Sequence, residues 1–341
     1  MQPRTMIATL AALGALGTPI SVGASANTST SQGANGGITM AILGDTPYGD
    51  AQLREFPALV AAINADPRVR AIAHVGDIKT GSSPCTTAYF ESIRNQFDSF
   101  EDPLLYTPGD NEWTDCHRSA AGGYDPLERL DALRDVFFPS PGMTQGGHPR
   151  RVLSQAFDSD HSTYVENQRW IDKRVVFSMV HVVGSNNDLA PWFGAAETAE
   201  QRGRRLAEVS ARTAAALDWI DDTFDAAERT RAAGVALLMQ ADMWDAYSVA
   251  NNLPLDGFTP IVRRIAERSR AFAKPVLLVQ GDSHQYLVDQ PIATGDPIHG
   301  VIEPVPNLTR IVVPGATAAE WLRLNIDPKN PEVFSWDVVG V

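Results

Sequence analysis

The sequence predicts an α/β protein built around a mainly parallel sheet. In the N-terminal third of the chain, apolar runs of strand length alternate with segments of helical period. Several of the apolar runs end in a Gly-Asp pair, and functional groups in α/β folds lie at the carboxyl ends of the strands. This β-α-β-α-β order is typical of parallel strands joined by crossover helices.

The first five elements follow one another without long gaps. Short apolar runs at 38–43, 71–75 and 104–107 are predicted to be buried strands. Between them, residues 52–66 and 86–97 place apolar side chains three and four positions apart, which is the period of an amphipathic helix. We therefore expect the three strands to lie in one sheet.

The periodicity breaks at about residues 117–172, a stretch rich in Gly, Pro, Arg and His with one short helical piece at 126–136. We expect an insertion over the functional edge, because long connections of this kind are commonly functional. The later elements are predicted in this order: a strand at 175–183, a helix at 198–227, a strand at 234–239, a helix capped by Asp256 and ending at 273, a strand at 275–279, and β-runs at 309–313, 320–326 and 333–339. Without a visible linker or repeat, residues 38–341 are predicted to form a single domain.

The first 26 residues have the pattern of a cleavable export signal. A basic start with Arg4 precedes an apolar stretch at 6–20 and a small-x-small site at 24–26. An uncleaved membrane anchor is the alternative, which the shortness of the apolar stretch disfavours. Residues 27–37 are rich in Ser, Thr, Gly and Asn and are predicted to be a flexible lead-in. We expect an exported protein, periplasmic or secreted, with no membrane span after cleavage.

The charge balance is acidic. The chain has 28 Lys and Arg against 41 Asp and Glu, and 44% of its residues are hydrophobic, as in a globular protein with a sizeable core. The acidic excess argues against a nucleic-acid-binding surface, which needs a basic footprint. The expected partner is therefore a small-molecule substrate, and clustered carboxylates can also hold cations.

The only two cysteines are Cys85 and Cys116. In an oxidising compartment such a pair usually forms a disulfide, and two buried thiols are the alternative. Cys85 follows Asp77 by eight residues and Cys116 follows Asp110 by six. A bridge would therefore tie together two loops that each carry a Gly-Asp pair.

Five strand-end segments supply the residue types that bind metal ions. Because the carboxyl ends of parallel strands meet at one edge of a sheet, five such segments predict one shared, oxygen-rich site. Carboxylates favour hard cations, and His adds affinity for transition metals. The predicted metal donors are Asp45, Asp77, Asp110, Gln240, Asp282 and His284. A carboxylate that bridges two ions would create a binuclear centre suited to phosphoryl chemistry.

These segments resemble the motifs of the calcineurin-like metallophosphoesterase family, which includes the purple acid phosphatases. Asp45 matches the Asp of the first motif, Asp77 the bridging Asp of the second, and His284 the last His. The order of the motifs is reproduced over roughly residues 38 to 290. The resemblance implies a two-sheet sandwich flanked by helices, a two-metal centre and hydrolysis of a phosphate ester.

The sequence departs from the family pattern at several positions. Pro47, Gln240 and Asp282 stand where the family has His, and Asp110 stands where it has Asn. Asn111 replaces the catalytic His, so it is predicted to position substrate oxygens and not to act as an acid. With most imidazoles replaced by oxygen donors, the centre should favour Mn²⁺, Mg²⁺ or Ca²⁺ over Zn²⁺ or Fe, as one or two ions.

Further polar residues near these motifs are predicted to contact substrate. Each has a structural alternative: an ion pair with the acidic cluster, a turn, a solvated loop or an Asx-turn. The residues are Lys79, Tyr48, His117, Arg118, Asn186 and Asn187. His74 and His181 lie within apolar runs and are predicted to be core histidines.

Two hypotheses for function follow. The first is an exported, metal-dependent phosphoesterase in which metal-bound hydroxide attacks a phosphate ester. The alternative is a non-catalytic protein that keeps the metallophosphoesterase fold as a binding or scaffold module. The loss of most of the family's motif histidines, including the catalytic one, motivates this alternative. Clustered carboxylates favour the first hypothesis, since without a cation they repel one another.

Overall fold

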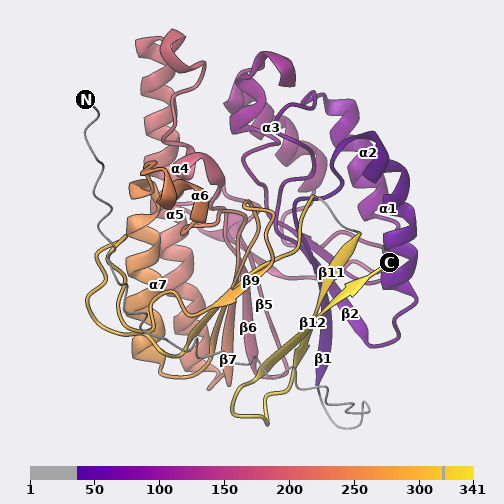
Figure 1. Ribbon diagram of the computed structural model, residues 1–341. Helices are drawn as coiled ribbons and strands as arrows, with labels where there is room; N and C mark the ends of the chain where they lie inside the picture. The colour runs from indigo at the N-terminus through magenta and orange to yellow at the C-terminus, as the bar shows by residue number, and fades with distance from the viewer. Residues whose placement is uncertain (1–36, 317–318) are drawn as a thin grey trace, which may run out of the picture. The chain divides into compact units, whose positions relative to one another are not determined.

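The computed structural model describes residues 37–316 and 319–341, which belong to one compact unit, Asn35–Val341. The predicted signal at 1–26 and nearly all of the lead-in at 27–37 lie outside the described residues. Two β-sheets lie between two layers of helices, and Figure 1 shows the helical layers on opposite sides of the strands. The predicted two-sheet sandwich flanked by helices is confirmed.

The five-stranded sheet has the order β12-β11-β1-β2-β3. Its strands are β1 (Ile38–Leu43), β2 (Val69–His74), β3 (Leu104–Tyr106), β11 (Glu320–Ile326) and β12 (Phe334–Gly340). The three strands predicted from the N-terminal alternation are parallel neighbours, whereas β11 and β12 pair antiparallel. The last two β-runs of the chain therefore return to complete the sheet that the N-terminus began.

The seven-stranded sheet has the order β4-β5-β6-β7-β8-β10-β9. Its strands are β4 (Leu153–Ser154), β5 (Gln168–Asp172), β6 (Val175–Met179), β7 (Gly234–Leu238), β8 (Val276–Gln280), β9 (Leu287–Asp289) and β10 (Leu308–Val312). The four strands β6, β7, β8 and β10 are parallel, and the edge strands are antiparallel. Both sheets are thus mixed; the parallel strands lie at the centre of the seven-stranded sheet and on one side of the five-stranded sheet.

The predicted insertion at about 117–172 ends in a strand of the seven-stranded sheet. Its last residues form β5, which pairs with β6 through a tight hairpin turn at Lys173 and Arg174. Both turn residues have positive φ, 45° and 61°. Asn and Gly are the usual residues at such positions, so this hairpin carries no turn signal that the sequence could show.

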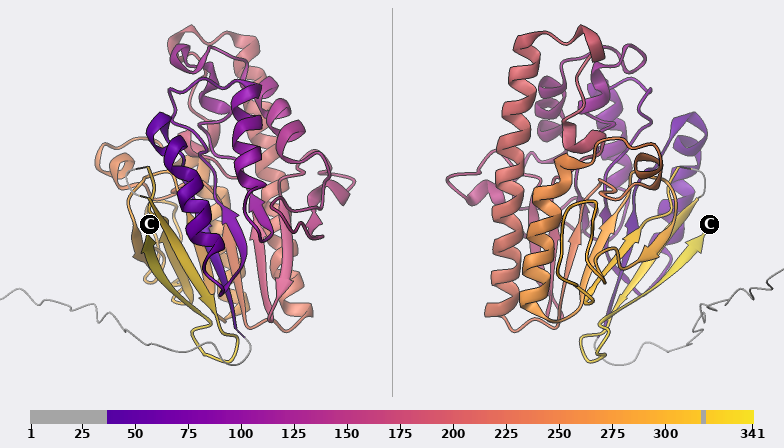
Figure 2. Two further views of the ribbon diagram at one scale, coloured as in Figure 1. Left: turned by 90° about the vertical axis from the view of Figure 1, so that its right-hand side faces the viewer. Right: turned by 60° about the vertical axis from the view of Figure 1, so that its left-hand side comes forward.

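The helices form two outer layers. α1 (Gly49–Asn64), α2 (Thr87–Phe97) and α3 (Pro126–Phe137) cover the five-stranded sheet, while α5 (Ala199–Arg229) and α7 (Thr259–Phe272) cover the other. Figure 2 shows α5 and α7 running side by side. Within the described residues, no helix combines the length and apolar character needed to cross a bilayer.

The start of α7 differs from the prediction. Asp256 was expected to cap this helix, but it begins the 3-10 turn η5 (Asp256–Phe258), and α7 starts only at Thr259. The side chain of Asp256 instead accepts a hydrogen bond from Asn186. The Asp256 carboxylate therefore binds a residue that is distant in sequence and does not cap α7.

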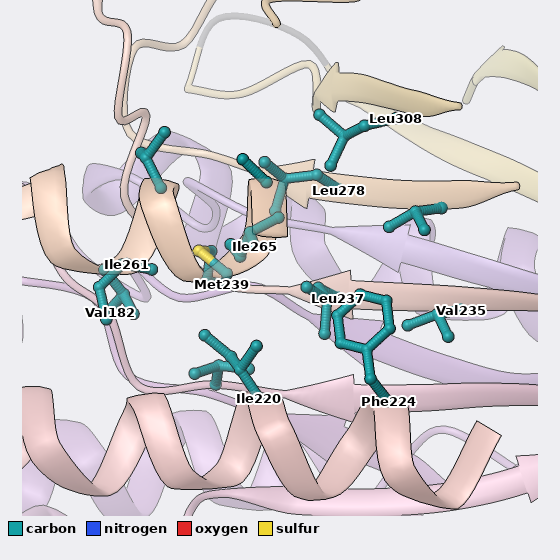
Figure 3. Packing of buried hydrophobic residues seen from close by; sticks show 14 of the residues in the cluster. Val182, Ile220, Phe224, Val235, Leu237, Met239, Ile261, Ile265, Leu278 and Leu308 are labelled. Atoms are coloured by element: carbon teal, nitrogen blue, oxygen red, sulfur yellow. The ribbon is translucent and has the colours of Figure 1, made fainter. Parts of the chain in front are cut away.

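The core lies on both faces of each sheet. In β7 and the residue after it, Val235, Leu237 and Met239 face α5 and α7, whereas Ala236 and Leu238 face the other sheet. Figure 3 shows the outer set packed against Ile220 and Phe224 of α5, among others. Because successive strand residues point to opposite faces, a strand buried on both faces reads as an unbroken apolar run.

Candidate metal centre

The carboxyl ends of the parallel strands from both sheets carry the predicted donors. Asp45, Asp77 and Asp110 follow β1, β2 and β3, whereas Gln240 follows β7, and Asp282 and His284 follow β8. Ligand atoms within each of two overlapping groups lie within 4.8 Å of one another: Asp45–Asp77–His284 and Asp77–Asp110–Asp282. Asp77 belongs to both groups, so the two sheets meet at this carboxylate.

Four of these residues have a left-handed backbone. The φ angles are 53° at Asp45, 57° at Asp77, 74° at Asp282 and 58° at His284. Non-glycine residues in this region cost about 1–3 kcal/mol each and persist only where surrounding structure enforces them. The turns that follow β1, β2 and β8 therefore direct these side chains into the centre at a conformational cost.

Asp77 is the most heavily hydrogen-bonded group of the centre. Its Oδ2 accepts from the Tyr48 hydroxyl at 3.0 Å, from Asn111 Nδ2 at 2.8 Å and from Gln240 Nε2 at 3.2 Å. Its Oδ1 accepts from the backbone N–H of Asn111 at 3.2 Å. Gly109 allows this packing, because a Cβ there would lie 2.1 Å from Asp77 Oδ1.

Asp45 and His284 form the side of the centre that opens to solvent. The backbone N–H of Asp282 donates to both carboxylate oxygens of Asp45, which is fully buried. His284 Nε2 lies 3.4 Å from Asp45 Oδ1, and the imidazole side chain is 38% exposed. The hydrogen bond to Asp45 raises the pKa of His284 above its ordinary value. His284 Nε2 also lies 3.2 Å from the Tyr48 hydroxyl.

Asp110 and Gln240 form the inner side. Asp110 Oδ2 accepts from the Ser185 hydroxyl at 2.8 Å, and Oδ1 accepts from Gln240 Nε2 at 3.2 Å. Gln240 Oε1 accepts from the backbone N–H of Gly184 at 2.6 Å. The amide oxygen, which is the atom that binds metals, is thus committed to the backbone, and the amide nitrogen faces two carboxylates. This orientation differs from the predicted role of Gln240 as a metal ligand.

The carboxylates of the centre destabilise one another's charged forms. Burial, followed by repulsion from Asp110, raises the pKa of Asp77 and of Asp282 well above the ordinary value of an Asp. A bound cation would relieve both effects. Almost all of the donors are carboxylate oxygens, so this chemistry fits a hard divalent ion such as Mn²⁺, Mg²⁺ or Ca²⁺.

A left-handed turn brings Ser185 to Asp110. In α4 (Gly184–Asp188), the residues from Ser185 onward have φ between 54° and 62°. Runs of left-handed residues are rare because each costs roughly 1–2 kcal/mol. The buried Arg212 of α5 holds the turn, donating to the side chain and, at 3.1 Å, to the backbone carbonyl of Asn187.

The predicted substrate contacts of Asn186 and Asn187 differ from what this turn shows. Asn186 donates to Asp256 and accepts from the N–H of Gly257, and Asn187 donates to Thr213 and to the carbonyl of Gly257. Their side chains hold the turn against its neighbours. The residue of this turn that reaches the centre is Ser185, which the sequence analysis missed, although the same strand-end rule applies to Gly184-Ser185 after β6.

Lys79 lies beside the acidic cluster, which was the structural alternative to a substrate contact. Its ammonium group is fully buried and donates to the carbonyls of Thr80 and Asn111, at 2.9 and 2.5 Å. Burial lowers the pKa of Lys79, although the charge of Glu112 opposes this shift. A side chain enclosed in this way supports the loop and does not meet a substrate phosphate from solvent.

Glu112 is a second residue whose role the sequence did not reveal. Its Oε1 accepts from the N–H groups of Asp77 and Gly109, at 3.1 and 2.7 Å, and from the Tyr106 hydroxyl at 2.7 Å. Its position directly after Asp110-Asn111 was a possible signal. Glu112 fixes the ends of β2 and β3 to each other.

Tyr48 and Arg118 border the centre: Tyr48 contacts Asp77 directly, and a Cβ on Gly81 would lie 2.6 Å from Arg118 Nη1 and 2.7 Å from Asn111 Oδ1. The Tyr48 hydroxyl accepts from Asn111 Nδ2 at 2.9 Å, so its three neighbours, Asp77, Asn111 and His284, are all predicted site residues. In η1 (Thr114–His117), His117 Nδ1 contacts the carbonyl of Thr114 at 2.7 Å, and burial lowers the pKa of this imidazole. Arg118 is half-exposed and pairs with Asp115 at 2.7 Å.

The predicted disulfide between Cys85 and Cys116 is confirmed. The Cα atoms lie 5.8 Å apart, and both residues are fully buried. The two sulfur atoms lie 3.7 and 3.8 Å from the backbone carbonyl oxygen of Asn111, which also accepts from Lys79. The bridge therefore lies directly beneath the Asn111 segment of the centre.

His74 is a buried core histidine, as predicted, and it also links two loops of the centre. Its Nε2 contacts the carbonyl of Thr46 at 2.8 Å, and its Nδ1 accepts from the N–H of Gly76 at 3.2 Å. These partners require the neutral form with the proton on Nε2. Burial accordingly lowers the pKa of His74 to about 4.

Comparisons with known proteins found structural neighbours only. Neither a family model nor a curated protein matches the sequence. The chain is structurally similar to GAP50, the anchor in the inner membrane complex of Plasmodium, with 9% identity and a TM-score of 0.46 over 89% of each chain. It is also similar to the purple acid phosphatase PPD1 from yellow lupin seeds, with 10% identity and a TM-score of 0.43 over 90% of this chain and 54% of that one.

Proposed function

We propose that this chain is a metal-dependent phosphoesterase with an oxygen-rich centre. The observation that carries the proposal is the overlap of two ligand groups, Asp45–Asp77–His284 and Asp77–Asp110–Asp282, at the meeting edge of the two sheets. A divalent ion bound there would offset the buried negative charge, polarise a phosphate ester and lower the pKa of water. The remaining residues bind and orient the ester.

Tyr48 is the group best placed to contact the ester. Burial, followed by the charge of Asp77, keeps the pKa of Tyr48 well above its ordinary value, so the side chain remains a neutral phenol. Its hydroxyl lies beside Asp77 and His284. Arg118, half-exposed at the outer side, supplies a positive charge for the phosphate. Asn111 holds Tyr48 and Asp77 through the two hydrogens of its amide.

The centre has a weak supply of protons for a leaving group. Asn111 has no titratable proton, and the lowered pKa of His117 leaves this imidazole neutral near pH 7. In the neutral form that donates from Nδ1 to Thr114, Nε2 of His117 is an acceptor. We therefore expect esters with good leaving groups, such as p-nitrophenol, to react much faster than alkyl esters.

The test is turnover of p-nitrophenyl and bis-p-nitrophenyl phosphate with Mn²⁺, Mg²⁺, Ca²⁺ and Zn²⁺. Asp77→Asn should lower activity by at least about 100-fold, because it removes the carboxylate shared by both ligand groups. Asp98→Asn, an exposed substitution at the end of α2, is the matched control and should leave activity unchanged. Activity that survives both EDTA and Asp77→Asn would refute the proposal.

One observation favours the alternative, a non-catalytic binding module. The Asn111 amide, which has no titratable proton, contacts both Asp77 and Tyr48, so the centre could bind an ion without having an acid there for a leaving group. A binding module would take up Mn²⁺ in calorimetry and show no turnover on a broad panel of esters. The same Asp77→Asn variant would then lose metal uptake alone.

A further inference from the structure

We infer that the centre holds a single divalent cation, between Asp45, Asp77 and His284, and that the amide of Gln240 takes the place of a second. This inference rests on the proposed metal-dependent function and specifies its stoichiometry. It follows from which protein hydrogens face the carboxylates in each of the two ligand groups.

In the inner group, an amide nitrogen lies between the two carboxylates. Gln240 Nε2 is 3.2 Å from Asp77 Oδ2 and 3.2 Å from Asp110 Oδ1. Each of its two hydrogens therefore has a carboxylate acceptor. An amide nitrogen has no lone pair to offer a cation, so an ion between Asp77 and Asp110 would face N–H groups.

Gln240 cannot simply turn over to present its oxygen. Oε1 accepts from the buried backbone N–H of Gly184 at 2.6 Å, and a flipped amide would place two donors against each other there. The side chain also cannot move away as a whole, because its Cβ and Cγ atoms are tightly packed. A Cβ on Gly76 would lie 2.8 Å from Cβ of Gln240, and one on Gly109 would lie 2.8 Å from its Cγ.

In the outer group, the protein atom that lies between the ligands is a hydroxyl oxygen and not an amide nitrogen. There the Tyr48 hydroxyl lies 3.0 Å from Asp77 Oδ2 and 3.2 Å from His284 Nε2. A phenol oxygen carries lone pairs, so it can turn toward a cation or bind it. The His284 side chain is 38% exposed, which gives an ion a path from solvent.

Protein hydrogen-bond donors also contact the inner carboxylates. The Ser185 hydroxyl and the Gln240 amide donate to Asp110, and the Asp242 N–H donates to Asp282 at 3.3 Å. Hydrogen-bond donors thus offset part of the negative charge of the inner group. The carboxylate of Asp45 has the imidazole of His284 and the backbone N–H of Asp282 as neighbours.

The experiment measures how many Mn²⁺ ions bind per chain, by native mass spectrometry and by electron paramagnetic resonance. The wild type should bind one ion and show the hyperfine pattern of an isolated Mn²⁺ instead of an exchange-coupled pair. His284→Ala, at an exposed position, should weaken binding by at least about tenfold. Asp282→Asn should leave the stoichiometry at one.

Gln240→Glu replaces the amide nitrogen that faces Asp77 and Asp110 with a carboxylate oxygen. The substituted side chain keeps an oxygen for the Gly184 N–H and replaces the donor with a carboxylate, so this variant should bind two ions. Gln240→Met has similar length and removes the amide hydrogens without adding an oxygen; it should bind a second ion more weakly than Gln240→Glu does, and it controls for loss of packing.

The outcomes separate the inference from the proposed function. Two ions in the wild type, or none, would overturn the inference. One ion that depends on His284 and not on Asp282 supports it, even when no ester is hydrolysed, in which case only the proposed function fails. A Gln240→Glu variant that folds and still binds one ion would show that the amide is not what excludes the second.

Discussion

Removing the Cys85–Cys116 bridge should destabilise the protein by an amount that the loop length sets. The bridge joins residues 31 positions apart. In the chain-entropy model, opening a loop of this size costs about 3.7 kcal/mol. For a compact unit of roughly 300 residues, an unfolding entropy of about 2.1 cal/mol/K per residue converts this loss to about 6 °C in Tm.

The assay compares thermal and urea unfolding of the wild type with the Cys85→Ala/Cys116→Ala double variant, and of the oxidised with the reduced wild type. Both comparisons should show the same loss, because alanine and a reduced thiol equally lack the cross-link. Hydrogen exchange should also accelerate at the amides of Asn111 and Asp115, since the sulfur atoms lie beneath the carbonyl of Asn111. Unchanged Tm values, or two titratable thiols in exported, non-reduced protein, would refute the reasoning.

Three further predictions concern the surroundings of the centre. The free energy of unfolding should fall at low pH because of His74, whose pKa of about 4 in the folded state lies below the ordinary value. As the pH falls, His74 takes up a proton in the unfolded chain before it does so in the folded protein. Its contribution to the free energy of unfolding is therefore complete above about pH 6.5 and falls by roughly 3 kcal/mol as the pH drops to about 4. Urea unfolding of the wild type and of His74→Asn over this pH range checks the prediction. Gly184→Ala would put a Cβ 2.8 to 2.9 Å from oxygens of Asp110 and Asp282, so it should lower the free energy of unfolding in urea by about 1–3 kcal/mol and leave one Mn²⁺ ion bound; an unchanged free energy of unfolding would contradict the packing. Arg212→Met leaves the left-handed turn without its buried donors and should cost about 3–5 kcal/mol in urea unfolding, whereas a loss below about 1 kcal/mol would show that the turn holds itself.

Much of the fold was predictable because its signals are local. A buried strand shows itself as an apolar run and an amphipathic helix as a period, so β1, β2, β3, β7, β8 and the helices between them appeared close to their observed bounds. The hairpin at Lys173-Arg174 was not predictable, because its positive φ angles occur at residues that usually avoid them. The left-handed α4 turn depends on Arg212 from a distant helix and has no local signal either.

The sequence by itself determined the order of strands and helices, the residue types at the strand ends and the pairing of the two cysteines. These properties depend on spacing along the chain. Only the tertiary structure decided how each side chain is used. It enclosed Lys79, turned Asn187 toward Arg212, brought Ser185 to Asp110 and oriented the amide of Gln240. Such orientations depend on hydrogen-bond partners from other strands and helices, which no local pattern specifies.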